Sequence, residues 1–229
     1  MGAKRIAAAH QPHYLPWLGY IHKILVSDVF VLLDTVQYAK NGWINRNKVK
    51  TSRGWQWITV PVVHRFGDPI LAVAIDARQL WSRKHLQALI SNYSRARFFS
   101  RYCPVFDDLY ARPWERLAEL NCAVVARLLE CMNVSRELVK ASELGLPDEP
   151  TERLIGACKA VGATTYLSGP HGVKYMRLER FEEEGIEVVF QDFRHPVYPQ
   201  LFGDFIADLS VVDLLFNCGD ESTRIVLEG

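Results

Sequence analysis

The chain has 229 residues, of which 49% are hydrophobic, and its 27 basic and 26 acidic side chains leave a formal net charge of +1. This length and composition predict one large domain with a substantial hydrophobic core. A net charge so close to zero excludes a global field that would attract nucleic acid or an anionic membrane, and no apolar run is long enough to span a bilayer. We therefore expect neither a nucleic-acid nor a membrane partner.

The first third of the chain predicts a strand, a helix and a second strand in close succession. The run "RIAAAH" predicts a strand ending at His10, and "PWLGYIHKILV" predicts a helix with Pro16 in its first turn. The continuous apolar run "DVFVLLD" is typical of a strand buried on both faces. These three segments form a βαβ unit. Residues 55–63 and 70–76 flank "HRFGDP" and predict a β-hairpin with Gly67 in its turn.

The middle of the chain, about residues 79–140, predicts a helical insertion. Its segments "LWSRKHLQALISNY" and "WERLAELNCAVVARLLECM" have apolar side chains at helical spacing. Beyond it, "ERLIGACKAVG" predicts a helix that Thr151 helps to cap and that stops near Gly162. The runs "TTYLSG" and "IEVVFQDF" predict strands, and "DLSVVDLLFNCG" predicts a terminal helix closed by Gly219. The expected fold is a single α/β domain over residues 1–229, Rossmann-like, with a mostly parallel sheet, a β-hairpin and a helical middle region.

The cysteines predict free thiols in a reducing cytoplasm. Their number is odd, and no CxxC pair or Cys/His pair at zinc spacing occurs. Four are expected to be small buried residues, whereas the reactivity of the fifth, in the turn "LLFNCGD", stays open. The five are Cys103, Cys122, Cys131, Cys158 and Cys218. His10 and His13 lack carboxylate or thiolate partners, so we expect no metal site.

Four predicted strands are apolar until their last residues and then become polar. In parallel strands these ends would line one edge of the sheet, where open α/β sheets bind ligands. Solvated loops alone would explain part of the pattern. They explain less well the Gly-, Pro- and aromatic-rich turns that follow, such as "SGPHG" and "RHPVYPQ". The polar ends are His10-Gln11, Asp34, Ser168-Gly169 and Gln191-Asp192.

A basic and aromatic segment, "DTVQYAKNGWINRNKVKTSRGWQW", follows the second predicted strand. It has five basic residues and no acidic ones between Lys40 and Arg53. Arg46 offers a planar fork for phosphate, and Lys50 offers a point charge. Such a loop suits a diphosphate, a phosphopantetheine or a coenzyme A tail. A base-stacking platform and a merely solvated loop are the alternatives, and the near-neutral chain favours a small phosphorylated ligand.

Two histidines are the best candidates for a general base, because histidine titrates near neutrality. His10 ends a strand, and His195 lies in "RHPVYPQLFG", where prolines stiffen the loop as a preorganised site requires. A purely structural turn is the alternative for that loop. His22, in the first helix, is expected to face solvent.

The ordered blocks "HQPHYLPWLGY", "DTVQYAKNGWINRNKVK", "WITVPV", "TTYLSGPHGVKY" and "HPVYPQLFGDFIADLSVVDLLFNCG" resemble the WbqC-like family over nearly the whole chain. That family takes its name from a protein encoded among bacterial O-antigen genes. The resemblance implies transfer of an acyl or aminoacyl group, such as glycyl, to a nucleotide-linked amino sugar in lipopolysaccharide biosynthesis. It further implies a carrier-protein or CoA thioester as co-substrate, and a cytoplasmic enzyme with no tightly bound cofactor. A nucleotidyltransferase-like enzyme and a non-catalytic carrier-protein or sugar-nucleotide binding module stay open as alternatives.

The resemblance transfers no catalytic residues, so the candidate site comes from the blocks themselves. Its core is one cavity surrounded by His10, Arg46, Ser168 and His195. The candidate catalytic residues are His10, His195, Gln11 and Ser168. The candidate substrate-binding residues are Tyr14, Trp17, Asp34, Gln37, Lys40, Trp43, Asn45, Arg46, Lys50, Tyr166, Gly169, Tyr198 and Gln200.

Overall fold

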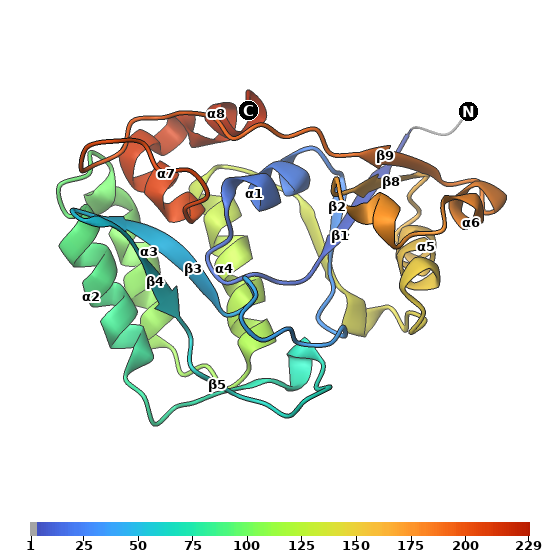
Figure 1. Cartoon of the computed structure of the whole chain (residues 1–229), viewed down its shortest axis with the longest axis horizontal. Coiled ribbons are helices and arrows are strands. Elements are labelled where there is room, and N and C mark those ends of the chain that lie inside the picture. Colours follow the sequence, from blue (N-terminus) through green and yellow to red (C-terminus); the bar gives the residue numbers. More distant parts are fainter. Residues whose placement is uncertain (1–3) are drawn as a thin grey trace.

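A computed structural model of the protein describes residues 4–229. Its centre is a five-stranded sheet in the order β7-β2-β1-β8-β9, in which every neighbouring pair of strands is parallel (Figure 1). The α/β, Rossmann-like prediction is therefore confirmed. The strands are β1 (Ile6–His10), β2 (Val29–Leu32), β7 (Glu137–Lys140), β8 (Thr165–Ser168) and β9 (Glu187–Phe190).

The strand order positions the functional edge of the sheet. Strand β1 lies in the centre; the chain first adds β2 and β7 on one side and later β8 and β9 on the other. The topological switch point therefore falls between β1 and β8, and ligands bind such sheets just beyond the carboxyl ends of the strands there. His10 and Ser168, the last residues of these two strands, flank that point.

Helices cover both faces of the sheet. Figure 1 shows α2, α3 and α7 on the left of the molecule and α5 and α6 on the right. The α-helices are α1 (Leu18–Leu25), α2 (Trp81–Tyr93), α3 (Phe99–Ala111), α4 (Leu117–Cys131), α5 (Pro150–Ala160), α6 (Leu178–Glu183), α7 (Val211–Cys218) and α8 (Ser222–Leu227). Short 3₁₀ turns are η1 (Ile70–Ala72), η2 (Ala141–Glu143), η3 (Gly172–Lys174) and η4 (Gly219–Glu221).

The core divides at the sheet because side chains alternate between its faces. Ala7 and Ala9 of β1 pack in the cluster that contains α5 and α6, whereas Ala8 packs in the larger cluster with α1 to α4 and α7. Strand β2 alternates in the same way, with Val31 on one side and Phe30 on the other. Small residues along the central strand let helices approach it closely from both sides.

The predicted hairpin is present in a different form. Strands β5 (Val62–Val63) and β6 (Ala74–Ile75) pair around "HRFGDP", but over only two residues each. The long antiparallel pair is β3 (Arg46–Thr51) with β4 (Gly54–Thr59), so the basic segment expected to be a loop is largely a strand. The alternation of buried and exposed residues that identifies a strand is not visible in this sequence. Asn47 and Val49 are buried, but Lys50, which an alternating strand would expose, is buried as well.

Three boundaries also differ from the predictions. Helix α1 begins at Leu18, after Pro16, and the cap of α5 is the side chain of Glu149, which accepts from the amide of Glu152, rather than Thr151. Strand β7 occupies the expected end of the helical region. A four-residue segment has too little periodicity to identify from sequence, and only its pairing with β2 makes it a strand.

Candidate functional site

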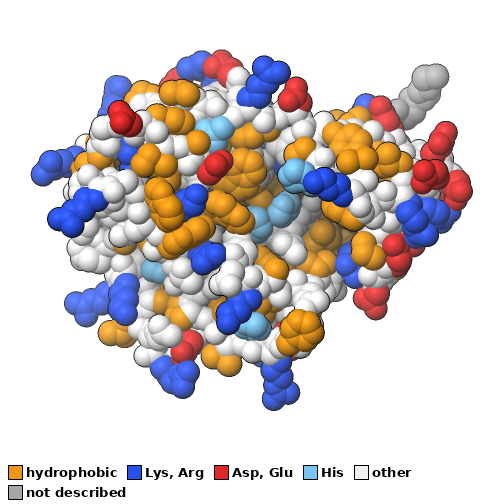
Figure 2. All heavy atoms as spheres, viewed as in Figure 1, with side chains coloured by type: hydrophobic (Ala, Val, Ile, Leu, Met, Phe, Trp, Pro, Cys, Tyr) orange, Lys and Arg blue, Asp and Glu red, His pale blue; other side chains and the backbone are white. Residues whose placement is uncertain are grey.

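A cavity of about 660 Å³ opens at the carboxyl ends of β1, β8 and β9. Figure 2 shows pale-blue histidine side chains gathered around a hollow near the middle of the face. The volume is in the range of small-molecule sites. Its lining includes His10, Gln11, Trp17, Gly19, Tyr20, Lys23, Arg153, Tyr166, Gly169, His171, Gly172, Tyr175, Gln191 and Asp192. This switch-point pocket is the candidate active site.

His10 enters the switch-point pocket from the last position of β1. Its ring lies edge-on to His13 and Tyr20, with centroid distances of 4.6 and 5.1 Å. Burial, together with the nearby charge of Lys23, lowers the pKa of His10 to about 4. The ring is therefore neutral near pH 7, and with Nδ1 donating to the carbonyl of Gln11 at 3.2 Å, Nε2 remains as an acceptor.

Lys23 is a pocket residue that the sequence analysis missed. Its side chain is only 4% exposed; Nζ donates to the carbonyl of Ala9 at 3.0 Å and lies 5.9 Å from the ring centroid of Tyr166. Burial lowers the pKa of Lys23 to about 8. One feature of the sequence could have indicated that Lys23 belongs to the pocket. It lies four residues after Gly19 and three after Tyr20, so the three residues share one face of the helix.

The turn after β8 forms another part of the pocket wall. Gly169, His171 and Gly172 line the pocket, whereas Ser168 is fully buried behind it and donates through Oγ to the carbonyl of Gly169 at 3.0 Å. A Cβ at Gly172 would overlap this hydroxyl, so the turn requires glycine there. Ser168 thus shapes the wall and does not reach the cavity.

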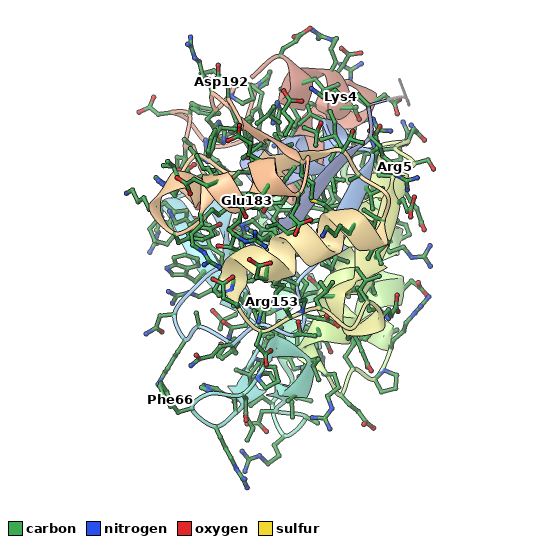
Figure 3. All side chains as sticks on the ribbon, turned by 90° about the vertical axis from the view of Figure 1, so that its right-hand side faces the viewer. Lys4, Arg5, Phe66, Arg153, Glu183 and Asp192 are labelled. Carbon is green, nitrogen blue, oxygen red and sulfur yellow. The ribbon has the colours of Figure 1, made fainter. Side chains whose placement is uncertain are left out.

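The end of β9 is tied to α1 by Gln191, whose side-chain amide donates to the carbonyl of Gly19 at 2.8 Å and to Nδ1 of His22 at 2.9 Å. The prediction that His22 faces solvent is wrong: the residue is only 7% exposed, because the end of β9 and the following loop pack over that side of the helix. In Figure 3, Asp192 lies in the upper part of the view and Arg153 below it, near the middle, and both line the pocket.

Part of the basic segment lines a second hollow of about 430 Å³, which shares no lining residue with the first. Lys40, Asn45 and Arg46 line it. Arg46 donates to the carbonyl of Asn41 at 2.6 Å and lies over the ring of Trp57 at 4.4 Å. Trp43 is not part of this lining, and Lys48 lies 5.5 Å from its ring.

A third group of candidates belongs to a buried network under α7. Nζ of Lys50 donates to Oε1 of Gln200 at 2.9 Å, and its backbone amide donates to the hydroxyl of Tyr93. That hydroxyl in turn donates to Asp213 at 2.9 Å. His195 lies nearby with both ring nitrogens engaged: Nδ1 donates to the carbonyl of Pro196, and Nε2 accepts from the amide of Asp208. Its ring stacks on the buried Tyr198.

Asp213 makes the stability of this network depend on pH. Burial raises the pKa of Asp213 to about 6, above its usual 3.8, although the Tyr93 hydrogen bond opposes the shift. The folded chain then binds this proton more tightly than the unfolded chain. The stabilisation is fully present below pH 4 and is lost as the pH rises through about 6.

We therefore expect D213N, which is uncharged at every pH, to gain stability relative to the wild type as the pH rises. The gain between pH 4 and pH 7 should be about 2.4 kcal/mol, at about 1.4 kcal/mol for each unit of pKa. Urea unfolding of both proteins from pH 4 to pH 8 measures it, and a difference that does not change with pH would contradict the assignment.

The structure thus separates the predicted site residues. His10, Gln11, Trp17, Tyr166 and Gly169 meet in the switch-point pocket, but Arg46 and His195 lie elsewhere, so His10, Arg46, Ser168 and His195 do not surround one cavity. Three further candidates hold the fold together. Tyr14 bonds to His85 and Tyr110, Asp34 accepts from Ser142, and Gln37 forms an isolated backbone bridge with Pro69.

Within residues 4–229, the structure also bears on reactive cysteines, metal ligands and membrane-spanning helices. All five cysteines are free, and burial raises the pKa of Cys218 to about 11, so its thiolate is scarce at neutral pH. No group of three or more His, Cys, Asp or Glu side chains in this range is arranged to hold a metal ion. None of the helices described combines the length and apolar character that a membrane crossing requires.

Comparison with known proteins places this geometry in a family context. The sequence model of the WbqC-like protein family matches residues 11–225. A protein of Mycobacterium tuberculosis named "Uncharacterized protein Rv1507c" is 37% identical over 223 residues, which cover 96% of each chain. No solved structure gives a significant match.

Proposed function

The chain belongs to the WbqC-like protein family, and we propose that it is an N-acyltransferase or aminoacyltransferase of bacterial surface-polysaccharide biosynthesis. It would move an acyl group, such as glycyl, from a carrier-protein or CoA thioester to the amine of a nucleotide-linked amino sugar. The observation that carries the proposal is His10, a histidine kept neutral with Nε2 available, at the switch point of a parallel sheet and inside a cavity of ligand size.

The reaction needs a proton acceptor and an oxyanion donor. The amine nitrogen attacks the thioester carbonyl carbon, and Nε2 of His10 accepts the proton that the nitrogen loses. The backbone N–H of Gly169 or His171, or the side-chain amide of Gln11, donates to the developing oxyanion. The C–S bond then breaks, the amide forms, and the imidazolium returns its proton to the departing thiolate.

The charges of the two hollows fit anionic substrates. The charged side chains lining the switch-point pocket are Lys23 and Arg153 against one carboxylate, Asp192. At the second hollow, Lys40 and Arg46 offer charge for the phosphate of a pantetheine arm or of CoA. Lys50 is not available for this role because it is fully buried in the network with Gln200.

An intact-mass assay with an aminoacyl-loaded carrier protein and an amino-sugar nucleotide tests the proposal. We expect the sugar nucleotide to gain the acyl mass as the carrier loses it. Pyrophosphate release from ATP or CTP without thioester consumption would instead indicate a nucleotidyltransferase. Ligand-dependent melting without turnover would indicate a binding module.

Filling the pocket should abolish this turnover. A Cβ at Gly169 meets no atom within 4 Å, so Gly169→Phe adds a ring to the pocket lining without a backbone clash. The matched control is Val197→Phe, which places the same ring at an exposed position that lines neither hollow. We expect G169F to lose at least 90% of the transfer rate and V197F to keep most of it. Equal rates for the two variants would remove the pocket from the reaction.

A further inference from the structure

The ammonium of Lys23 has unused hydrogen-bonding capacity inside the switch-point pocket. A lysine ammonium has three N–H donors, and among residues 4–229 this one makes a single hydrogen bond, to the carbonyl of Ala9, and no ion pair. The side chain is 4% exposed. Burying a charge without a counter-charge costs several kcal/mol, so such groups are normally paired. The pocket therefore holds a cation that has no counter-charge among the described residues and is available to a bound anion.

The other charges of the pocket do not supply that partner. Asp192 acts on His22, whose pKa it raises against the effect of burial, whereas burial alone accounts for the lowered pKa of Lys23. Arg153, the second cation, is bound to the carbonyls of Pro147 and Asp148 at 3.1 and 2.6 Å. The inner part of the pocket around Lys23 thus carries positive charge that no carboxylate of the lining neutralises.

We infer that the ammonium of Lys23 is the anion subsite of the pocket and that it binds one phosphoryl group of the substrate. The inference deepens the proposed function, on which its choice of ligand rests. Lysine binds phosphate as a compact point charge. Two co-substrates of the proposed reaction contain phosphoryl groups, the nucleotide of the acceptor and the phosphopantetheine of the donor. The pocket lining also contains Gly169, where a Cβ would meet no atom within 4 Å, so a ligand has room to approach the backbone there.

The variant K23Q separates this role from a structural one. Glutamine can still donate a hydrogen bond to the carbonyl of Ala9, but it carries no charge. A lysine that only ties α1 to β1 would be replaced adequately by glutamine, whereas an anion subsite would not. The matched control is K84Q, at an exposed lysine of α2.

Isothermal titration calorimetry with UDP and with 4′-phosphopantetheine, as separate probes, measures the effect. We expect K23Q to lose at least tenfold in affinity for one probe, while K84Q binds like the wild type. Loss for UDP alone identifies the acceptor's nucleotide as the phosphoryl source, and loss for phosphopantetheine alone identifies the donor. Loss for both means that the two co-substrates use the subsite in turn.

A second measurement needs no variant. Because the pKa of Lys23 is about 8, roughly half of these side chains are unprotonated at pH 8, and a bound anion favours the protonated form. Binding at pH 8 should therefore take up about half a proton per site, which titrations in two buffers of different ionisation enthalpy reveal. The affinity should fall as the pH rises above 8.

Unchanged binding in K23Q, no proton uptake, or no binding of either probe to the wild type would each overturn the subsite. A different result would contradict the proposed acyl transfer alone. If probe binding depends on Lys23 but no acyl mass is transferred from a thioester, the anion subsite is supported and the acyl-transfer reaction is contradicted.

Discussion

Replacing His10 by alanine should lower kcat for acyl transfer by about two to four orders of magnitude, the usual contribution of a positioned general base. Among the described residues the ring makes no hydrogen bond to another side chain, and its one polar contact is with the neighbouring carbonyl of Gln11, so the fold should survive its loss. The melting temperature and the initial rate of thioester consumption, measured on the same preparation, test both parts. Full activity in the variant would remove His10 from the mechanism.

Two histidines outside the switch-point pocket serve as controls. H195A removes a ring whose two nitrogens are already engaged, and H64A removes a partly buried ring that lines the second hollow and not the switch-point pocket. Both should keep kcat within about threefold of the wild type. A loss in H195A comparable to that in H10A would restore His195 as the base.

The pH profile adds an independent check on His10. Its pKa is lowered to about 4 by burial and by Lys23. The rate should therefore fall on the acid side only near pH 4, where the imidazole of His10 becomes protonated, and not near pH 6.5. An acid limb near 6.5 would indicate a more exposed histidine as the base.

The largest effect on stability is expected for F216A. Phe216 of α7 is fully buried, and its ring lies 5.1, 5.2 and 5.5 Å from the rings of Tyr93, Phe99 and Phe106, between centroids. Removing it leaves a cavity where α2, α3 and α7 meet, and a buried Phe→Ala change costs about 3–5 kcal/mol. The free energy of unfolding from urea titrations measures this cost.

The control for F216A is the same substitution at Phe66, which is 98% exposed. F66A should change the free energy of unfolding by no more than about 0.5 kcal/mol. If F216A also stayed within that range, the packing of the helical region against α7 would need revision.

Several features of the fold were predictable because they depend on local pattern. The strand ending at His10, the buried run of β2 and the helices α2 and α4 each follow from periodicity within a dozen or so residues. Strands β3 and β7 were not predicted because only their pairing with other strands identifies them. Strand β3 pairs with β4 although three of its residues are basic, and β7 pairs with β2.

The candidate site was predictable only in part. The polar strand ends His10, Gln11 and Gly169 line the switch-point pocket together, since parallel strands bring their carboxyl ends to one edge. Lys23 stayed hidden because a lysine within a helix is usually solvated, and only the burial of the whole of α1 reveals it. Asp34, Tyr14 and Lys50 carry the polarity expected of ligand-binding residues, but they form hydrogen bonds within the fold.

The sequence by itself determined the α/β class, the order of most elements and the polar residues at the strand ends, because these follow from patterns among residues near in the chain. Only the tertiary structure decided which polar side chains share a cavity and which ionisable groups have shifted pKa values. Those properties depend on distances between distant segments and on how completely each group is removed from water. No local pattern records either quantity.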